Sequence, residues 1–479
     1  MPAHRRPGQT VRMSARLGSL DAAFLELEDA QEAAHMHLGA VMIFEARPDG
    51  PPAIGRLRTE LESRLVALPR YRSRLTATHV GPLRRPSWEP DPSFTVRDHV
   101  LRAALPAPGG ERELMEWCGE YWSTRLDRSR PLWEVVLVEG LEGGRWALAT
   151  KTHHALVDGL ASVGVTELLL DHSRAGSRRP AEAPAAEDED GGAAALTELL
   201  GGLVRSGADL VSHPMRLVRE TKAAAELIVR EELVPAPASS LNVAIGPHRR
   251  YRVARARLSD LKAIKNALGG TVNDVVLAAA AGGLRRLLVE RGDELPEHGL
   301  RAMVPVSMRI RDDADNGTQL GNRVSSLFVH LPVCEPEPLR RYLVTAGETA
   351  QLKAAGQAKS GAELLALAGL APPLLHSVLA RSSTGARLFN VTVTNVPGPP
   401  RALYAFGARM EEVLPLVPLA ADHAVGIAVV SYNGRMFFGL SGDARSAPDL
   451  DVLREGIEDS IRELRAEARH ERAAAGGPS

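Results

Sequence analysis

The chain has 479 residues, of which 44% are hydrophobic and 24% are charged, and its formal net charge is -1. This composition predicts a globular enzyme with a large core, divided into two domains, and the charge indicates no nucleic acid partner. The two cysteines, Cys118 and Cys334, lie far apart in the sequence, so neither a disulfide framework nor a thiolate metal site is expected, and a reducing cytoplasm fits.

The N-terminal residues 1–16 are basic and polar, and no apolar stretch follows them, so no secretory signal peptide is expected. A membrane-spanning helix needs about 18 or more consecutive apolar residues, and no segment has them. Residues 275–284 stop at an arginine pair, and residues 364–379 are interrupted by Pro372-Pro373. Both segments favour buried helices, which leaves only shallow membrane contact open.

The first half of the chain ends in a predicted strand, residues 145–152, and Pro131-Leu132-Trp133 begins an earlier one. Trp133 is most simply a core residue. The segment His153-His154-Ala155-Leu156-Val157-Asp158-Gly159 follows the later strand. Strand ends are where the sites of α/β folds gather.

Side chains alternate along a strand, so only one of His153 and His154 can address a substrate, while the other supports it. Histidine has the unperturbed pKa nearest neutrality, which suits a base that removes the proton of an attacking alcohol. Asp158 either holds the loop through an arginine partner or acts directly on an imidazole. Gly159 opens a helical pattern.

A linker follows the first half. Residues 173–192 have low hydrophobicity and contain Glu187-Asp188-Glu189-Asp190, which predicts a mobile segment. Helical patterns over residues 196–211 and 214–228 come next and are expected to bridge two domains; their basic side chains also permit an interfacial helix on lipid. The predicted division is therefore residues 1–173, 174–240 and 241–479.

The second half repeats the α/β character. Thr271 can cap a helix whose first turn holds Asn273 and Asp274, and capping alone explains the pattern. Asn395-Val396-Pro397-Gly398-Pro399 predicts a rigid loop near the domain junction, and Gly321-Asn322-Arg323 offers a partner for Asp158. Strands are predicted at residues 302–306, 324–331, 390–394 and 425–432, the last joined to 435–440 by the hairpin turn Asn433-Gly434.

Other catalytic signatures are missing from the sequence. It has no GxSxG nucleophile elbow, no GxxxxGK[ST] phosphate loop and no HExxH zinc helix. An acyl-serine hydrolase and a nucleotide-driven ligase therefore lack support.

The HHxxxDG pattern at residues 153–159 resembles that of the acyltransferase superfamily of chloramphenicol acetyltransferase, peptide-synthetase condensation domains and carnitine acyltransferases. Further segments are similar to the bacterial wax ester synthase/diacylglycerol acyltransferases, and they span almost the whole chain. These are Ser19-Leu20-Asp21-Ala22-Ala23-Phe24-Leu25, Met36-His37-Leu38-Gly39, Leu126-Asp127-Arg128, Pro131-Leu132-Trp133-Glu134, Thr271-Val272-Asn273-Asp274-Val275-Val276, Val304-Pro305-Val306-Ser307, Gly321-Asn322-Arg323 and Thr394-Asn395-Val396-Pro397-Gly398-Pro399.

The resemblance implies two chloramphenicol-acetyltransferase-like domains packed face to face, with the active channel at their interface. It implies His154 as the general base, with His153 and Asp158 as supporting residues. Asn273 and Asp274 become candidates for shaping the channel, either by touching substrate or by structural support. Gly159, Trp133 and Arg323 are further channel candidates.

The function implied is acyl-CoA-dependent O-acyl transfer that makes triacylglycerol from diacylglycerol, with wax esters from long-chain alcohols as a second activity. Acyl-CoA is a co-substrate, and neither a cofactor nor a metal is expected. Two alternatives stay open: acyl transfer to a polyketide, peptide or sugar hydroxyl, and a catalytically silent lipid-surface protein. The expected location is the cytoplasm, with peripheral attachment to membranes or lipid droplets through residues 196–211 or 364–379.

Overall fold

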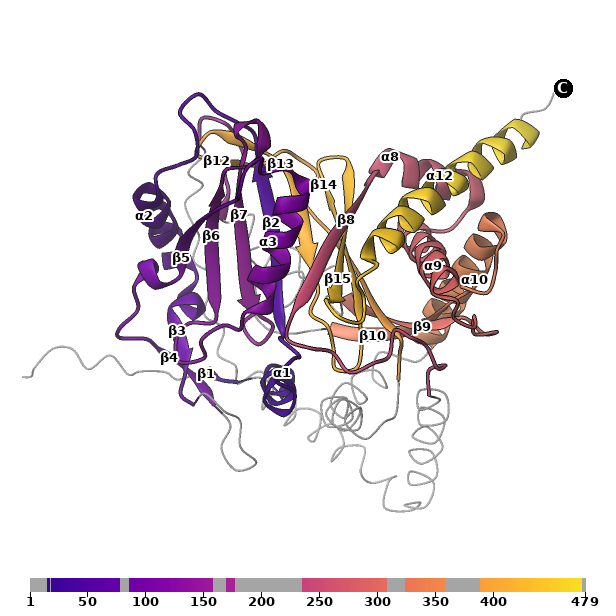
Figure 1. Cartoon of the computed structure of the whole chain (residues 1–479), viewed down its shortest axis with the longest axis horizontal. Helices are drawn as coiled ribbons and strands as arrows, with labels where there is room; N and C mark the ends of the chain where they lie inside the picture. The colour runs from indigo at the N-terminus through magenta and orange to yellow at the C-terminus, as the bar shows by residue number, and fades with distance from the viewer. Residues whose placement is uncertain are drawn as a thin grey trace, which may run out of the picture.

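The computed structural model describes residues 15–17, 19–77, 86–157, 169–176, 235–307, 324–358 and 388–475. Two six-stranded sheets lie side by side, and helices cover their outer faces (Figure 1). The α/β class predicted from the sequence is therefore confirmed.

The first sheet has the order β12-β13-β2-β7-β6-β5. Strand β7 lies at its centre, antiparallel to both β2 and β6, and β5 runs parallel to β6. A three-stranded sheet of order β1-β4-β3 lies apart from it, and short 3₁₀ segments connect the larger elements. The bounds are β1 (Ala15–Arg16), α1 (Ser19–Ala30), β2 (His37–Phe44), α2 (Ile54–Arg64), β3 (Ser73–Leu75), β4 (Ser87–Pro90), β5 (Val100–Ala104), α3 (Glu111–Ser123), β6 (Trp133–Glu139), β7 (Trp146–His153), β12 (Tyr404–Ala405) and β13 (Ala408–Leu416), with 3₁₀ turns at Leu65–Ala67, Pro69–Arg72, Val96–Asp98 and Glu142–Gly144.

The second sheet has the order β10-β9-β11-β14-β15-β8. The described helices α8, α9, α10 and α12 lie beside it, on the other side of the molecule from α2, whereas α3 lies near the middle beside β8 (Figure 1). The bounds are β8 (Arg249–Arg257), α8 (Leu258–Leu268), α9 (Val272–Arg291), β9 (Leu300–Ser307), β10 (Val324–Leu331), α10 (Pro338–Ala358), β11 (Val391–Pro397), β14 (Val425–Tyr432), β15 (Arg435–Asp443) and α12 (Leu450–Ala475).

The long helix α9 shows how local sequence sets this packing. Thr271 caps its start through a reciprocal capping box with Asp274, and Gly292, at φ 73°, ends it. A Cβ on Gly283 would lie 2.6 Å from Cγ1 of Ile457, so the missing side chain lets α12 pack directly against α9. The buried helix α9 therefore forms the centre of the second core.

The linear division of the chain does not separate the two sheets. Strand β13 belongs to the second half of the sequence but pairs with β2 of the first sheet, with Leu414 opposite Val41. The predicted range 241–479 therefore does not correspond to the second sheet alone, because residues 404–416 cross over and complete the first. Tyr251 of β8 donates a hydrogen bond to the carbonyl of Pro415 in β13 at 2.7 Å and so joins the two sheets where they meet.

The strands predicted in both halves are confirmed, to within a few residues at their ends. The loop predicted at residues 395–399 is wrong for its first three residues, because β11 continues through Pro397 by pairing with β14. The turn between β14 and β15 has positive φ at Asn433 (45°) and Gly434 (79°), as the predicted hairpin requires. The expected linker at residues 173–192, the helices at 196–211 and 214–228 and the apolar segment 364–379 lie wholly or mostly outside the described residues.

Among the described helices, none is both long and apolar enough to cross a membrane by itself. Helices α8 and α9 pass that test only when joined, and they are bent by 102° at their junction. Most apolar side chains of α9 are buried in the second core, although Val289 near its end is exposed.

Candidate active site

The end of β7 places the histidine pair at the centre of the first sheet. The backbone N–H of His153 donates to the carbonyl of Leu132 at 3.0 Å, and that of His154 donates to the carbonyl of Met36 at 2.8 Å. The pair is thus held from both sides, by the segments that precede β6 and β2. Each of these segments carries one of the motifs singled out in the sequence.

His153 is buried in a defined orientation. Its Nδ1 accepts a hydrogen bond from the backbone N–H of Ala155 at 3.0 Å, and its Nε2 lies 3.4 Å from a carboxylate oxygen of Glu28. An Nδ1 that accepts leaves the proton of a neutral ring on Nε2, where it faces the carboxylate. Burial lowers the pKa of His153 although Glu28 opposes this effect, so the ring is neutral near pH 7.

His154 has different surroundings. It is only partly buried, and its ring stacks on Phe24 of α1 with centroids 4.0 Å apart and planes 22° apart. The strand alternation that predicts one working and one supporting histidine is consistent with these two environments. His153 has the contacts of a supporting residue, and His154 is the more accessible ring.

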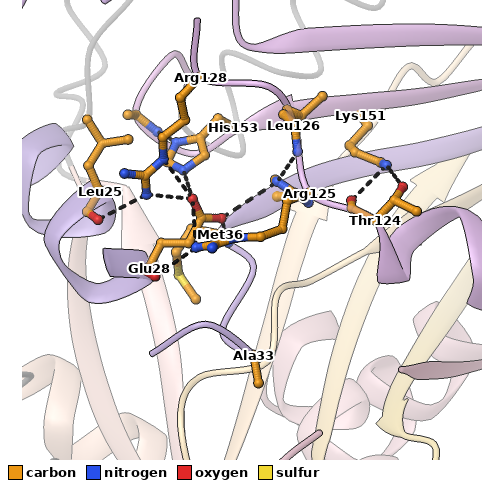
Figure 2. A network of polar contacts seen from close by, with 12 residues as sticks. Leu25, Glu28, Ala33, Met36, Thr124, Arg125, Leu126, Arg128, Lys151 and His153 are labelled. Carbon is orange, nitrogen blue, oxygen red and sulfur yellow. Dashed lines mark hydrogen bonds and ion pairs between the residues drawn. The ribbon is translucent and has the colours of Figure 1, made fainter. Parts of the chain in front are cut away.

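Sequence reasoning missed Glu28, which lies at the centre of the polar network around His153 (Figure 2). Its carboxylate accepts from the backbone N–H of Met36 at 3.1 Å and from Nε and Nη2 of Arg128 at 3.0 and 2.6 Å. The ring of His37 lies 3.7 Å away. The sequence carried only a weak signal for Glu28, a carboxylate close to Phe24 and Leu25 on the Ser19–Ala30 segment, together with the arginine of Leu126-Asp127-Arg128.

The second half contributes two motif residues that meet. Nδ2 of Asn395, on β11, donates to Oδ1 of Asn273 at 3.2 Å, at the start of α9. Asp274 instead accepts from the N–H and hydroxyl of Thr271 and, at 2.7 Å, from the hydroxyl of Thr349 on α10. Asp274 is thus held in structural contacts, whereas Asn273 is the member of the pair that joins two motifs.

Trp133 has the contacts of a core residue. It is buried, its ring stacks on His99 at 4.6 Å, and its Nε1 donates to the carbonyl of Tyr71 at 2.7 Å. The candidates Asp158, Gly159 and Arg323 lie outside the described residues. Within the described part of the chain, no group of three or more His, Cys, Asp or Glu side chains is arranged to hold a metal ion.

A cavity of about 1150 Å³ lies between α2 and the first sheet. Its wall includes Trp146, Leu148 and Thr150 of β7. At about 3.3 Å per residue, Thr150 is about 13 Å along the chain from His154. The cavity is therefore separate from the histidine pair along the same strand.

Comparison with known proteins assigns the family. Residues 17–276 match the wax ester synthase/diacylglycerol acyltransferase catalytic domain, and residues 320–465 match the WS/DGAT C-terminal domain. The chain belongs to this family. The resemblance inferred from the motifs is thereby confirmed.

Relatives and solved structures agree over nearly the whole length. The probable diacylglycerol O-acyltransferase tgs1 of Mycobacterium tuberculosis H37Rv is 34% identical over 464 residues, covering 94% of this chain and 95% of the relative. Its paralogue tgs2 is 35% identical over 458 residues, covering 93% and 97%. The wax ester synthase/diacylglycerol acyltransferase of Marinobacter aquaeolei VT8 has a TM-score of 0.67 at 28% identity, covering 95% of this chain and all of that one.

A condensation domain of low sequence identity shares the fold. The first condensation domain of the calcium-dependent antibiotic synthetase has a TM-score of 0.62 at 18% identity, covering 96% of this chain and 97% of that domain. This likeness confirms the fold expected for the HHxxxDG superfamily.

Proposed function

We propose that this family member transfers fatty acyl groups from acyl-CoA to diacylglycerol, forming triacylglycerol, and in a second activity to long-chain alcohols, forming wax esters. The observation that carries the proposal is the difference between the surroundings of the two histidines. His153 is fixed by Glu28 and Ala155, whereas His154, just beyond the end of β7, is stacked on Phe24 and only partly buried.

In the proposed reaction, His154 accepts the proton of the acceptor hydroxyl as the oxygen attacks the thioester carbonyl. The tetrahedral intermediate then collapses, the carbon–sulfur bond breaks, and the imidazolium returns the proton to the coenzyme A thiolate. The step needs two bound substrates held in line and no acyl-enzyme. The family membership favours this reading over transfer to a polyketide, peptide or sugar hydroxyl and over a catalytically silent protein.

The test combines purified protein, radiolabelled palmitoyl-CoA and a panel of acceptors: a diacylglycerol, hexadecanol, a sugar and a serine peptide. His154→Ala should lower turnover by about 100-fold or more, because general-base catalysis contributes at least that factor. His330→Ala, a histidine on β10 that bonds Glu348, is the matched control and should leave turnover unchanged. Near-native turnover in folded His154→Ala would show that the base is another group.

Asp158 is proposed to position the site, since direct transfer needs no acyl-aspartate. Asp158→Asn should lower turnover without any trapped intermediate. An acyl group found on Asp158 by mass spectrometry during turnover would contradict direct transfer.

We also propose a cytoplasmic enzyme that attaches reversibly to membrane or lipid-droplet surfaces. The support is chemical, because the acceptors and products of this reaction partition into lipid. Flotation with liposomes containing diacylglycerol, at rising salt, tests the idea. Failure to float at any salt concentration would count against it, and survival of binding in high salt would indicate hydrophobic insertion.

A further inference from the structure

Glu28 is a buried carboxylate with an unusual concentration of partners. Its side chain is 2% exposed. Its oxygens face Arg128 at 2.6 Å, Arg125 at 3.5 Å and His153 at 3.4 Å (Figure 2), and His37 lies 3.7 Å away. Glu28 lies on α1, and these partners come from the start of β2, from the segment between α3 and β6 and from the end of β7, so one carboxylate joins the elements around the histidine pair.

A buried carboxylate stays ionised only if nearby charges or hydrogen-bond donors offset the cost of removing it from water. Burial by itself raises the pKa of Glu28, but the nearby polar rings of His153 and His37 and the charge of the Arg128 guanidinium hold that pKa well below its usual range. Arg128 also bonds Asp29 at 2.6 Å and the carbonyl of Leu25 at 3.0 Å, which fixes the guanidinium against α1. Glu28 is therefore ionised and held in place.

An ionised Glu28 selects one form of the His153 ring. With the proton on Nε2, the ring donates toward the carboxylate while Nδ1 accepts from the N–H of Ala155. The other neutral form would set an Nδ1–H against the N–H of Ala155 and a lone pair against the carboxylate. Both contacts would then be repulsive.

With the ring of His153 in this form, hydrogen bonds fix the backbone on both sides of His154. The N–H of Ala155 bonds the ring of His153, and the N–H of Leu156 bonds the carbonyl of His153 at 2.9 Å. His154 is the residue between these anchored points. Its backbone direction depends on the ring that Glu28 orients.

We propose that Glu28 is a positioning residue for acyl transfer: it orients neutral His153, which through the N–H of Ala155 fixes the backbone from which His154 reaches the acceptor. This inference rests on the proposed role of His154. It gives Glu28 the direct contact with an imidazole that the sequence pattern alone left open for Asp158.

The first test is Glu28→Gln, which keeps the shape of the side chain and removes its charge. Turnover should fall by about 100-fold, the cost of displacing a catalytic group by about 1 Å, whereas KM for palmitoyl-CoA should stay within about 2-fold. Asp29→Asn is the matched control, since it removes the same charge one residue away and also contacts Arg128 but not His153. Equal losses in the two variants, or unchanged turnover in folded Glu28→Gln, would overturn the inference.

The second test needs no substitution of Glu28. In ¹⁵N-histidine-labelled protein near pH 7, the ring signals of His153, assigned by their loss in His153→Gln, should show a protonated Nε2 and an unprotonated Nδ1. A ring protonated on Nδ1 would refute the inference even if Glu28→Gln failed to fold. If the wild-type protein made neither triacylglycerol nor wax ester, the proposed function would fail, while this spectrum would still decide the role of Glu28 toward His153.

Discussion

Lys151 is a buried cation, and its titration should change the free energy of unfolding with pH in a direction that can be measured. Its side chain is fully buried on β7, and its Nζ donates to the carbonyls of Tyr121 and Thr124 at 2.7 and 3.0 Å and to the Thr124 hydroxyl at 2.8 Å. The ammonium group thereby caps the C-terminal end of α3. Burial lowers the pKa of Lys151 from 10.5 to about 8, and the carboxylate of Glu134, 3.6 Å away, only partly offsets this.

Between pH 8 and 10.5 the unfolded chain keeps a proton on this amine that the folded chain has lost. The free energy of unfolding therefore rises with pH through this group, by about 1.4 kcal/mol per pH unit. From pH 8 to 9.5 the gain amounts to about 2 kcal/mol. The Lys151→Met variant has no titratable group at this position, so it should lack this gain in the free energy of unfolding.

The assay is guanidinium unfolding of wild type and Lys151→Met at pH 7.5, 8.5 and 9.5. Tryptophan fluorescence reports the relevant part, because all five tryptophans lie at or before Trp146. Burial raises the pKa of the Cys118 thiol, so this group lowers the free energy of unfolding as the pH rises. Both proteins contain Cys118, and its contribution therefore cancels when their free energies of unfolding are subtracted. A difference that stays flat or falls from pH 8 to 9.5 would refute the reasoning.

Three further outcomes are expected. Gly439→Ala should lower the free energy of unfolding by about 1–3 kcal/mol, the usual cost of overpacking, because its Cβ would lie 1.9 Å from the carbonyl oxygen of Pro415. Gly55→Ala, where a Cβ would meet open space, is the control in the same denaturation measurement. Thr349→Val should cost about 1–3 kcal/mol in the same measurement, because it leaves the buried Asp274 carboxylate one hydrogen bond short. Burial lowers the pKa of His35 to about 4, so the protein should lose stability as the pH falls from 6.5 towards 4, and His35→Gln should make the acid limb of a melting-temperature profile shallower.

Several strands could be predicted from sequence, because their pattern is local. The predicted range 324–331 coincides with β10, and the hairpin turn follows from the two residues between β14 and β15. The partner of a strand is not a local property. Residues 408–416 form a strand in the second half of the sequence, yet they pair with β2, and nothing in their own pattern specifies that sheet.

The same distinction holds at the site. The histidine pair could be found because the whole HHxxxDG pattern lies within seven residues. Glu28 could not, because a single glutamate on a helix is ordinarily a solvated residue. Its role arises only when the fold brings it to Arg128, 100 residues away in the chain, and to His153.

The motif residues beside the histidines act mainly through their backbones. Leu132 and Met36 each give a carbonyl to the N–H of one histidine, and side-chain substitutions leave these carbonyls in place. Gly39 is different, because a Cβ there would lie 2.3 Å from the carbonyl oxygen of Thr150 and would push β2 away from β7. Since Met36 directly precedes β2, a shift of this strand would move the carbonyl that holds His154. A motif glycine remote from the reacting atoms thus constrains the same histidine that Glu28 positions through His153.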